Sequence, residues 1–271
     1  MHYAKETLRY IFKNFWRMLL LAIIPAVLLG LFTRPASIYQ YFTSVDYYGS
    51  TPDFWNVFVE VSFFECVWWK ILIKFIALAI VTAVSLGIIQ RHFKVGQFSF
   101  SKMPTFLNDN IIMVTCVFVA AAFVITLTQF LISGVIVLAY VMAATFNQYV
   151  IFSVVGIAIV YFIVLILFSL GMMWTAEMLE TGAGFFSGFG YAMHRVRGHV
   201  FSLFVGTFIP VPILLAFSYL FAYFNLSFGF AINMVLYVFI YMYYIAFAMV
   251  SYYDVSGIER EDLKKVNIWK R

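Results

Sequence analysis

NIIMVTCVFVAAAFVITLTQF, residues 110–130, begins a run without Asp, Glu, Lys or Arg that continues to Ala176. A second run of the same kind extends from Gly198 to Tyr253. A helix that crosses the hydrocarbon core of a bilayer needs about 20 apolar residues. Each run is therefore long enough for two crossings with a turn between them, and the sequence predicts an all-α, polytopic integral membrane protein.

The composition of the whole chain agrees with this fold class. The 271 residues are 65% hydrophobic and 11% charged, whereas soluble domains carry about 25% charged residues. The polar segments are short connections, which leaves no stretch for a soluble catalytic domain. The net charge of +5 comes from basic residues beside apolar runs, so the expected partners are the lipid bilayer and its anionic lipids, and no nucleic acid.

Six spans in three hairpins are predicted, forming a single membrane domain over residues 1–253. Each span is an apolar stretch bounded by polar or turn residues. The spans cover residues 18–32, 67–90, 111–142, 149–174, 200–222 and 230–252. Residues 33–53 are expected to form a polar, aromatic loop, and residues 254–271 a charged cytoplasmic tail.

Lys and Arg set the orientation of the predicted topology, because they are retained on the cytoplasmic side. Fourteen of them lie on the side of the two termini, and Arg34 is alone on the opposite side. Both termini are therefore expected in the cytoplasm. Amphipathic elbow helices are predicted on that face ahead of spans one, three and five, at residues 10–17, 104–110 and 191–199.

Residues 180–204, ETGAGFFSGFGYAMHRVRGHVFSLF, place an acidic residue and a small-residue turn before an amphipathic helix and a basic-Gly step. This segment resembles one in a poorly characterised bacterial six-span membrane protein family, related to the membrane domain found with glycerophosphodiester phosphodiesterases. The resemblance implies a bacterial cytoplasmic membrane and an unassigned role. It does not extend to phosphodiesterase activity, since these 271 residues contain no soluble phosphodiesterase segment. Gly188 and Ala192 also replace the regular Ala and Ser spacing.

Two lysines are the charges expected within a span. Lys70 and Lys74 are four residues apart and share one helical face. Charge inside a span is costly and often functional, which suggests a binding site for an anion or a lipid phosphate. In the alternative interpretation the lysines snorkel toward the outer interface, with Glu60 or Glu65 as an ion-pair partner.

Polar residues also recur at helical spacing along two spans. They either line a cavity for a ligand or join helices by hydrogen bonds. The stripe in span three is Thr126, Gln129 and Ser133, and the stripe in span six is Asn233, Tyr237, Tyr241 and Tyr244. Together with the two lysines, these stripes define a predicted ligand path of Lys70, Lys74, Gln129, Asn233, Tyr237 and Tyr241.

A polar cluster is predicted at the cytoplasmic mouth of spans four and five. Its histidines, His194 and His199, are five residues apart, unlike the i, i+4 pairs of helical metal sites, and the chain has no HExxH, GxSxG or GxxxxGK[ST] motif. We therefore expect no catalytic residue, metal site or cofactor. Arg195, Arg197 and His199 are predicted to face lipid headgroups or a protein partner.

Three functions are considered from these patterns. The leading hypothesis is a non-enzymatic multi-pass membrane protein that transports or handles a small or lipid-like ligand. The alternative is a membrane scaffold or accessory subunit that recruits a partner complex at the cytoplasmic face. An intramembrane enzyme acting on lipid would need a carboxylate or histidine pair within hydrogen-bond reach around Glu177 and His194.

Overall fold

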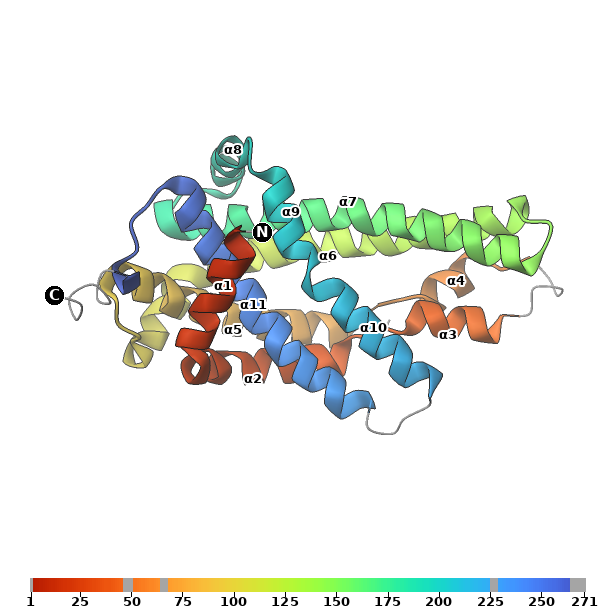
Figure 1. Ribbon diagram of the computed structural model, residues 1–271, viewed down its shortest axis with the longest axis horizontal. Helices are drawn as coiled ribbons and strands as arrows, with labels where there is room; N and C mark the ends of the chain where they lie inside the picture. Colours follow the sequence, from red (N-terminus) through yellow and green to blue (C-terminus); the bar gives the residue numbers. More distant parts are fainter. Residues whose placement is uncertain (1, 46–50, 64–67, 225–228, 264–271) are drawn as a thin grey trace.

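The computed structural model describes residues 2–45, 51–63, 68–224 and 229–263. In these ranges the elements of regular secondary structure are helices (Figure 1). They are α1 (His2–Lys13), α2 (Phe15–Phe32), α3 (Ser37–Ser44), α4 (Phe54–Glu60), α5 (Trp68–Val95), a 3₁₀ turn (Phe100–Lys102), α6 (Met103–Met142), α7 (Phe146–Thr181), α8 (Phe185–Val196), α9 (Val200–Phe208), α10 (Pro210–Tyr223) and α11 (Gly229–Ser256).

The long helices are apolar enough to cross a membrane. Five stretches meet the requirements of length and composition: Leu72–Val95, Phe100–Met142, Phe146–Thr181, Val200–Tyr223 and Ala231–Ser256. A sixth is added if α1 and α2, which are bent by 99° relative to each other, count as one span. The prediction of an all-α chain is therefore confirmed for the described residues, and five or six of its helical stretches fit a polytopic membrane protein.

The core forms around α11, which contacts α1, α2, α5, α7 and α10. From Tyr241 to Tyr253 nearly every residue of α11 is buried. A helix that is apolar on all sides is suited to the centre of a bundle rather than to its surface. On the α2 side, Met18, Ala22 and Ala26 are fully buried.

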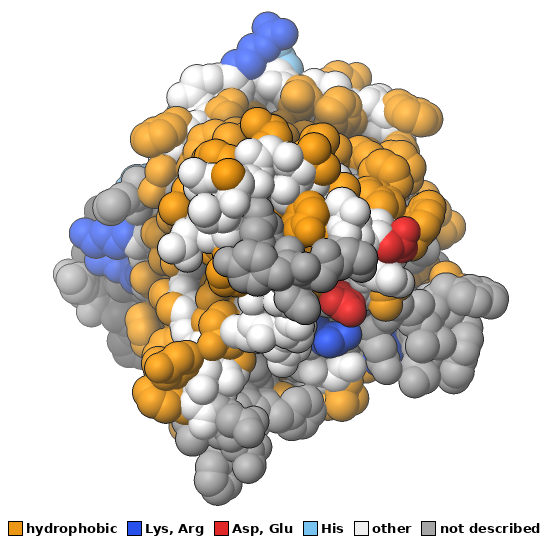
Figure 2. All heavy atoms as spheres, turned by 90° about the vertical axis from the view of Figure 1, so that its right-hand side faces the viewer, with side chains coloured by type: hydrophobic (Ala, Val, Ile, Leu, Met, Phe, Trp, Pro, Cys, Tyr) orange, Lys and Arg blue, Asp and Glu red, His pale blue; other side chains and the backbone are white. Residues whose placement is uncertain are grey.

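α6 and α7 form a long hairpin that reaches beyond α10 and α11 (Figure 1). α6 has 40 residues, which corresponds to a length of about 60 Å, twice the thickness of roughly 30 Å of a hydrocarbon core. Its outer half packs against α3 and α4, with Tyr41, Val57 and Ile136 in one buried cluster. Apolar side chains dominate this end of the molecule (Figure 2).

Three short segments differ from the sequence-based expectation. Residues 33–53 were predicted as a loop, but they contain α3, because Ile38 and Tyr41 bury one turn against the α6–α7 hairpin. Residues 104–110 are not a separate elbow, since α6 continues without a break from Met103. Residues 10–17 are divided by the bend at Asn14, and the amphipathic helix there is α1 itself.

The chain also turns between α8 and α9, within the predicted elbow 191–199. Gly198 has a φ of 87° there, a conformation that glycine adopts at little cost. At the C-terminus, α11 continues to Ser256, so the first three residues assigned to the tail belong to this helix. Arg260 and Asp262 are also buried, and residues 264–271 lie outside the described part of the chain.

Candidate functional site

The lysines of the predicted ligand path are only partly described. Lys74 donates a hydrogen bond from Nζ to the carbonyl oxygen of Leu31, 3.1 Å away at the end of α2. Lys70 belongs to α5, but its side chain, like residue Glu65, lies outside the described part of the structure. Glu60 forms no described ion pair with Lys74, so the structure does not support that predicted partnership.

The polar residues of the predicted path bind neighbouring helices. In α11, Asn233 accepts a hydrogen bond from Ser218 of α10 at 3.2 Å, and the Tyr237 hydroxyl pairs with Thr33 beside the end of α2. The hydroxyls of Tyr241 and Thr82 are 3.0 Å apart between α11 and α5.

Gln129 lies apart from these residues, because its Nε2 donates to the Phe58 carbonyl oxygen of α4 at 2.6 Å. The structure therefore brings Lys74 and Tyr237 to the same end of α2, while Gln129 contacts a different helix.

Two residues of the predicted cytoplasmic face contact neighbouring helices. Arg195 Nε lies 2.6 Å from Glu177 Oε2, a carboxylate that is 1% exposed, although the two atoms do not meet the geometry of a hydrogen bond. His199 Nδ1 is 2.8 Å from the hydroxyl of Tyr3 in α1. Arg197 and His199 are exposed and Arg195 is partly exposed, so their contact with lipid headgroups or a partner stays a prediction.

The residues considered for an enzyme do not form a catalytic pair. Glu177 is held by Arg195, and the exposed side chain of His194 makes no described hydrogen bond or ion pair. Among residues 2–45, 51–63, 68–224 and 229–263, no group of three His, Cys, Asp or Glu side chains could hold a metal ion.

A second ion pair lies close to the first, and a hydrogen bond connects it to a third helix. Lys94 Nζ of α5 lies 2.7 Å from Glu180 Oε2 of α7. The other oxygen of Glu180 accepts a hydrogen bond from the Tyr253 hydroxyl of α11 at 2.5 Å. Gln90 Nε2 also donates to the Leu179 carbonyl oxygen at 2.8 Å. These contacts fix the relative positions of α5, α7 and α11 at this end of the bundle.

Aromatic and basic side chains hold α1 and the C-terminal segment at the same end. The Tyr10 hydroxyl is 3.0 Å from His92 Nδ1, and burial raises the pKa of Tyr10 well above its usual value, so this hydroxyl stays protonated. Arg260 lies 4.2 Å from the ring centroid of Phe93 and binds Asp262 through two hydrogen bonds of 3.1 and 3.0 Å. The sequence analysis did not identify these residues, because Arg260 and Asp262 belong to a charged segment that resembles a solvated tail.

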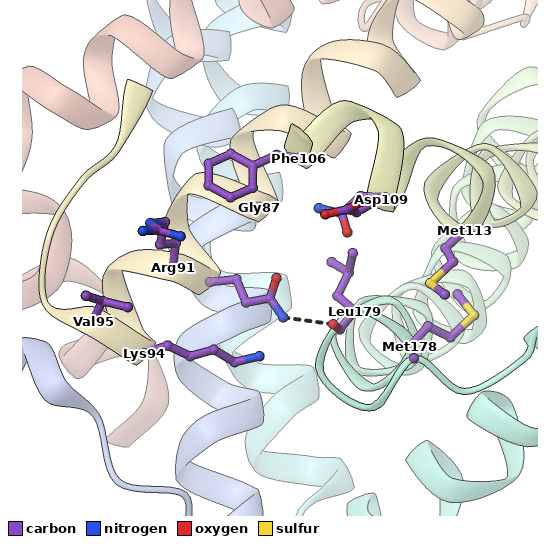
Figure 3. A pocket seen from close by; sticks show the side chains of 12 residues that line it. Gly87, Arg91, Lys94, Val95, Phe106, Asp109, Met113, Met178 and Leu179 are labelled. Atoms are coloured by element: carbon purple, nitrogen blue, oxygen red, sulfur yellow. Dashed lines mark hydrogen bonds between the residues drawn. The ribbon is translucent and has the colours of Figure 1, made fainter. Parts of the chain in front are cut away.

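A cavity of about 390 Å³ opens beside Gln90 and Lys94, between α5, α6 and α7. We call it the basic-end cavity, and Figure 3 shows its lining. Its polar and charged lining residues include Gln90, Arg91, Lys94, Asp109 and Asn110, and its apolar ones include Val95, Phe106, Met113, Met178 and Leu179. Its volume falls in the range of small-molecule sites, about 300–1,000 Å³.

Gly87 permits the close approach of α5 and α6 at the cavity wall. A Cβ atom at this position would lie 2.7 Å from both Phe106 Cβ and Asn110 Nδ2, closer than carbon atoms in contact, which pack about 3.5–4.0 Å apart. Asn110 also donates a long hydrogen bond of 3.4 Å to the Ala83 carbonyl oxygen. The first turns of α6 are therefore held against α5.

Two opposite charges in the basic-end cavity have no ion-pair or hydrogen-bond partner among the described residues. Arg91 on α5 and Asp109 on α6 lie on either side of the cavity (Figure 3). Neither makes a hydrogen bond or ion pair in the part of the chain that the structure describes. Lys94, in contrast, is balanced by Glu180. The sequence carried one signal for this pair, since both residues stand at the ends of long runs without charge.

The cavity lies where three helices change from apolar to charged sequence. No Asp, Glu, Lys or Arg occurs in α5 between Lys74 and Arg91, or from Asn110 of α6 to Ala176 of α7. Arg91, Asp109 and Glu177 therefore mark the same boundary on their helices. In a bilayer, this boundary corresponds to the level between hydrocarbon and headgroups.

A second cavity of about 300 Å³ lies at the opposite end, beside α3 and α4, and its lining includes Arg34, Tyr41 and Glu60. None of Lys74, Gln129, Asn233, Tyr237 and Tyr241 lines either cavity. A scan against protein-family models and searches of curated proteins and solved structures found no match for this chain. The geometry of the described residues is therefore the basis for a functional proposal.

Proposed function

We propose that this chain is a non-enzymatic, multi-pass membrane protein that handles a lipid-like ligand in the basic-end cavity. The observation that carries the proposal is the unpaired guanidinium of Arg91 in a cavity at the end of three apolar helices. A guanidinium is suited to phosphate and carboxylate groups, because its donors match their geometry. The apolar wall residues Phe106, Met113 and Met178 are compatible with the adjoining part of an amphiphile.

The position of the cavity supports handling at one face rather than a path through the centre. The described side chains of the predicted path make hydrogen bonds between helices, as with Tyr241 and Thr82. A ligand that passed between these helices would have to replace those bonds in hydrocarbon, at a cost for each unpaired polar group. The basic-end cavity requires no such exchange.

The orientation and the membrane follow from the sequence. We place the basic end in the cytoplasm, because it holds the excess of Lys and Arg. The resemblance of residues 180–204 to a bacterial six-span family favours a bacterial cytoplasmic membrane. The alternative function is a scaffold that recruits a protein partner. It is favoured by the exposed side chains of Phe186 in α8, at 85% exposure, and of Arg197 directly after α8.

Lipid retention by matched variants tests the proposal. The protein is purified in mild detergent, and its retained phospholipids are counted by native mass spectrometry in the parent chain, Arg91→Gln and Lys102→Gln. Both changes remove one positive charge at the same end, but the exposed Lys102 does not line the cavity. We expect Arg91→Gln alone to lower retention by about tenfold, the size of one charge-assisted hydrogen bond. Equal retention in all three proteins would contradict the proposal and favour the scaffold.

A further inference from the structure

The basic-end cavity has a charge pattern that selects among phosphate-bearing ligands. Arg91 is its unpaired cation and Asp109 its unpaired anion, on different helices and more than 4 Å from each other, since no ion pair joins them. The charge of Lys94 is already balanced by Glu180 at 2.7 Å. The groups left to meet a ligand are therefore one positive and one negative charge.

We infer that the basic-end cavity binds a zwitterionic headgroup, with its phosphate at Arg91 and a primary ammonium at Asp109. The inference rests on the proposed function and names its ligand class. A purely anionic headgroup would place its phosphate near the Asp109 carboxylate without a compensating cation. A zwitterion with the two charges a few atoms apart satisfies both side chains at once, as phosphoethanolamine does.

A primary ammonium fits this site better than a quaternary one. An ammonium has three N–H donors for a carboxylate, whereas a trimethylated nitrogen has none and is usually bound by a cage of aromatic rings. Among the residues that the structure describes, Phe106 is the one aromatic residue that lines the cavity. The lining thus provides a carboxylate for hydrogen bonds but no aromatic cage.

The walls indicate that the headgroup belongs to an amphiphile. Met113 and Met178 line the cavity on α6 and α7 (Figure 3), next to the long charge-free run of these helices. Methionine adapts its shape to irregular apolar ligands. Phosphoethanolamine occurs both as a lipid headgroup and as a soluble molecule, so the test must distinguish these sources.

The test is competition between phospholipids that have the same acyl chains. The full chain in detergent is offered equal amounts of phosphatidylethanolamine, phosphatidylcholine and phosphatidylglycerol, and retention is measured by native mass spectrometry. We expect phosphatidylethanolamine to be preferred over the other two by about tenfold, because it alone places an ammonium with N–H donors against the Asp109 carboxylate. A preference for phosphatidylglycerol in the parent protein would overturn the inference without any variant.

Two variants separate this inference from the proposed function. Arg91→Gln should lower the retention of all three lipids, and Asp109→Asn should abolish the preference for phosphatidylethanolamine while it keeps phosphatidylglycerol. Lys102→Gln serves as the charge-matched control and should change neither, because Lys102 is exposed and does not line the cavity. If Asp109→Asn keeps the parent preference but Arg91→Gln loses lipid, the zwitterion inference is wrong and the proposed function stands. If Arg91→Gln has no effect on any lipid, both are wrong.

Soluble phosphoethanolamine identifies the source of the headgroup. Displacement of phosphatidylethanolamine by this compound, with loss of displacement in Asp109→Asn, would support the zwitterion site and indicate a soluble ligand. Selective lipid retention that the compound does not displace would support the same site with a lipid as its ligand. Displacement that is unchanged in both Arg91→Gln and Asp109→Asn would place binding elsewhere and overturn the inference.

Discussion

Replacing Gly206 by alanine should destabilise the bundle through a single contact. Gly206 lies in α9, and a Cβ atom there would be 2.4 Å from Cε2 and 2.5 Å from Cζ of Phe247 in α11. The ring cannot easily move, because Phe247 is 1% exposed and stacks on Tyr243 with centroids 5.5 Å apart. Tyr243 is itself fixed by a hydrogen bond of 2.7 Å from its hydroxyl to the Gly206 carbonyl oxygen.

The expected magnitude combines two opposing effects. Overpacking of a well-filled core costs about 1–3 kcal/mol, whereas alanine in a helix gains up to about 1 kcal/mol over glycine. Gly171→Ala in α7 isolates the second effect, because a Cβ atom at Gly171 has no neighbour within 4 Å. The difference between the two variants therefore measures the clash, and it should be about 1–3 kcal/mol.

The assay is thermal unfolding of the purified variants in one detergent, followed by intrinsic fluorescence. A loss of 1–3 kcal/mol corresponds to a Tm roughly 2–10 °C below that of Gly171→Ala for a chain of this size. The double variant Gly206→Ala with Phe247→Leu should lose less stability than the sum of the single changes, because the smaller side chain relieves the contact. A Tm of Gly206→Ala equal to that of Gly171→Ala would refute the packing of α9 on α11.

Two further variants examine the polar contacts at the basic end. Arg195→Gln leaves the Glu177 carboxylate buried without its cation. Removing one partner of a buried pair costs about 3–5 kcal/mol. Because Arg195 is 36% exposed, solvent screening reduces the expected loss of stability to about 1–3 kcal/mol. The same melting assay should show less than about 0.5 kcal/mol for the exposed control Arg197→Gln, and equal Tm values for the two would contradict the ion pair. Tyr10→Phe removes the buried partner of His92 Nδ1 and should lower the free energy of unfolding by about 1–3 kcal/mol; an unchanged denaturant midpoint would show that this bond does not hold α1 in place.

The membrane-spanning character could be predicted from the sequence because it depends on composition over long windows. The charge-free stretch from Asn110 to Ala176 cannot be solvated in water, and it forms the α6–α7 hairpin. Helix α3 was not predictable in the same way. Its aromatic residues resemble an interfacial loop, and its stability comes from burying Ile38 and Tyr41 against α6 and α7, a contact between distant parts of the chain.

The polar stripes show a second limit of sequence patterns. Spacing predicts a stripe of Asn233, Tyr237 and Tyr241 along one helix, and the structure pairs these residues with α10, the end of α2 and α5 in turn. Spacing does not show whether the facing surface is a ligand or another helix. That distinction depends on partners such as Thr33, directly after α2, and Thr82 in α5, which are far from α11 in the sequence.

The packing of the helices at the basic end explains why two charges of the cavity have no ion-pair partner among the described residues. Lys94 and Arg195 each meet a carboxylate of α7, and these pairs fix α5, α8 and α7 together. Arg91 is one turn before Lys94 on the same side of α5, and it lines the cavity where Gly87 brings Asn110 of α6 close. Asp109 precedes Asn110 on α6. It lies across the cavity from Arg91 and too far from it for an ion pair. Two charges held apart by rigid helices at the edge of hydrocarbon lack a protein partner, and a ligand with complementary charges would stabilise both.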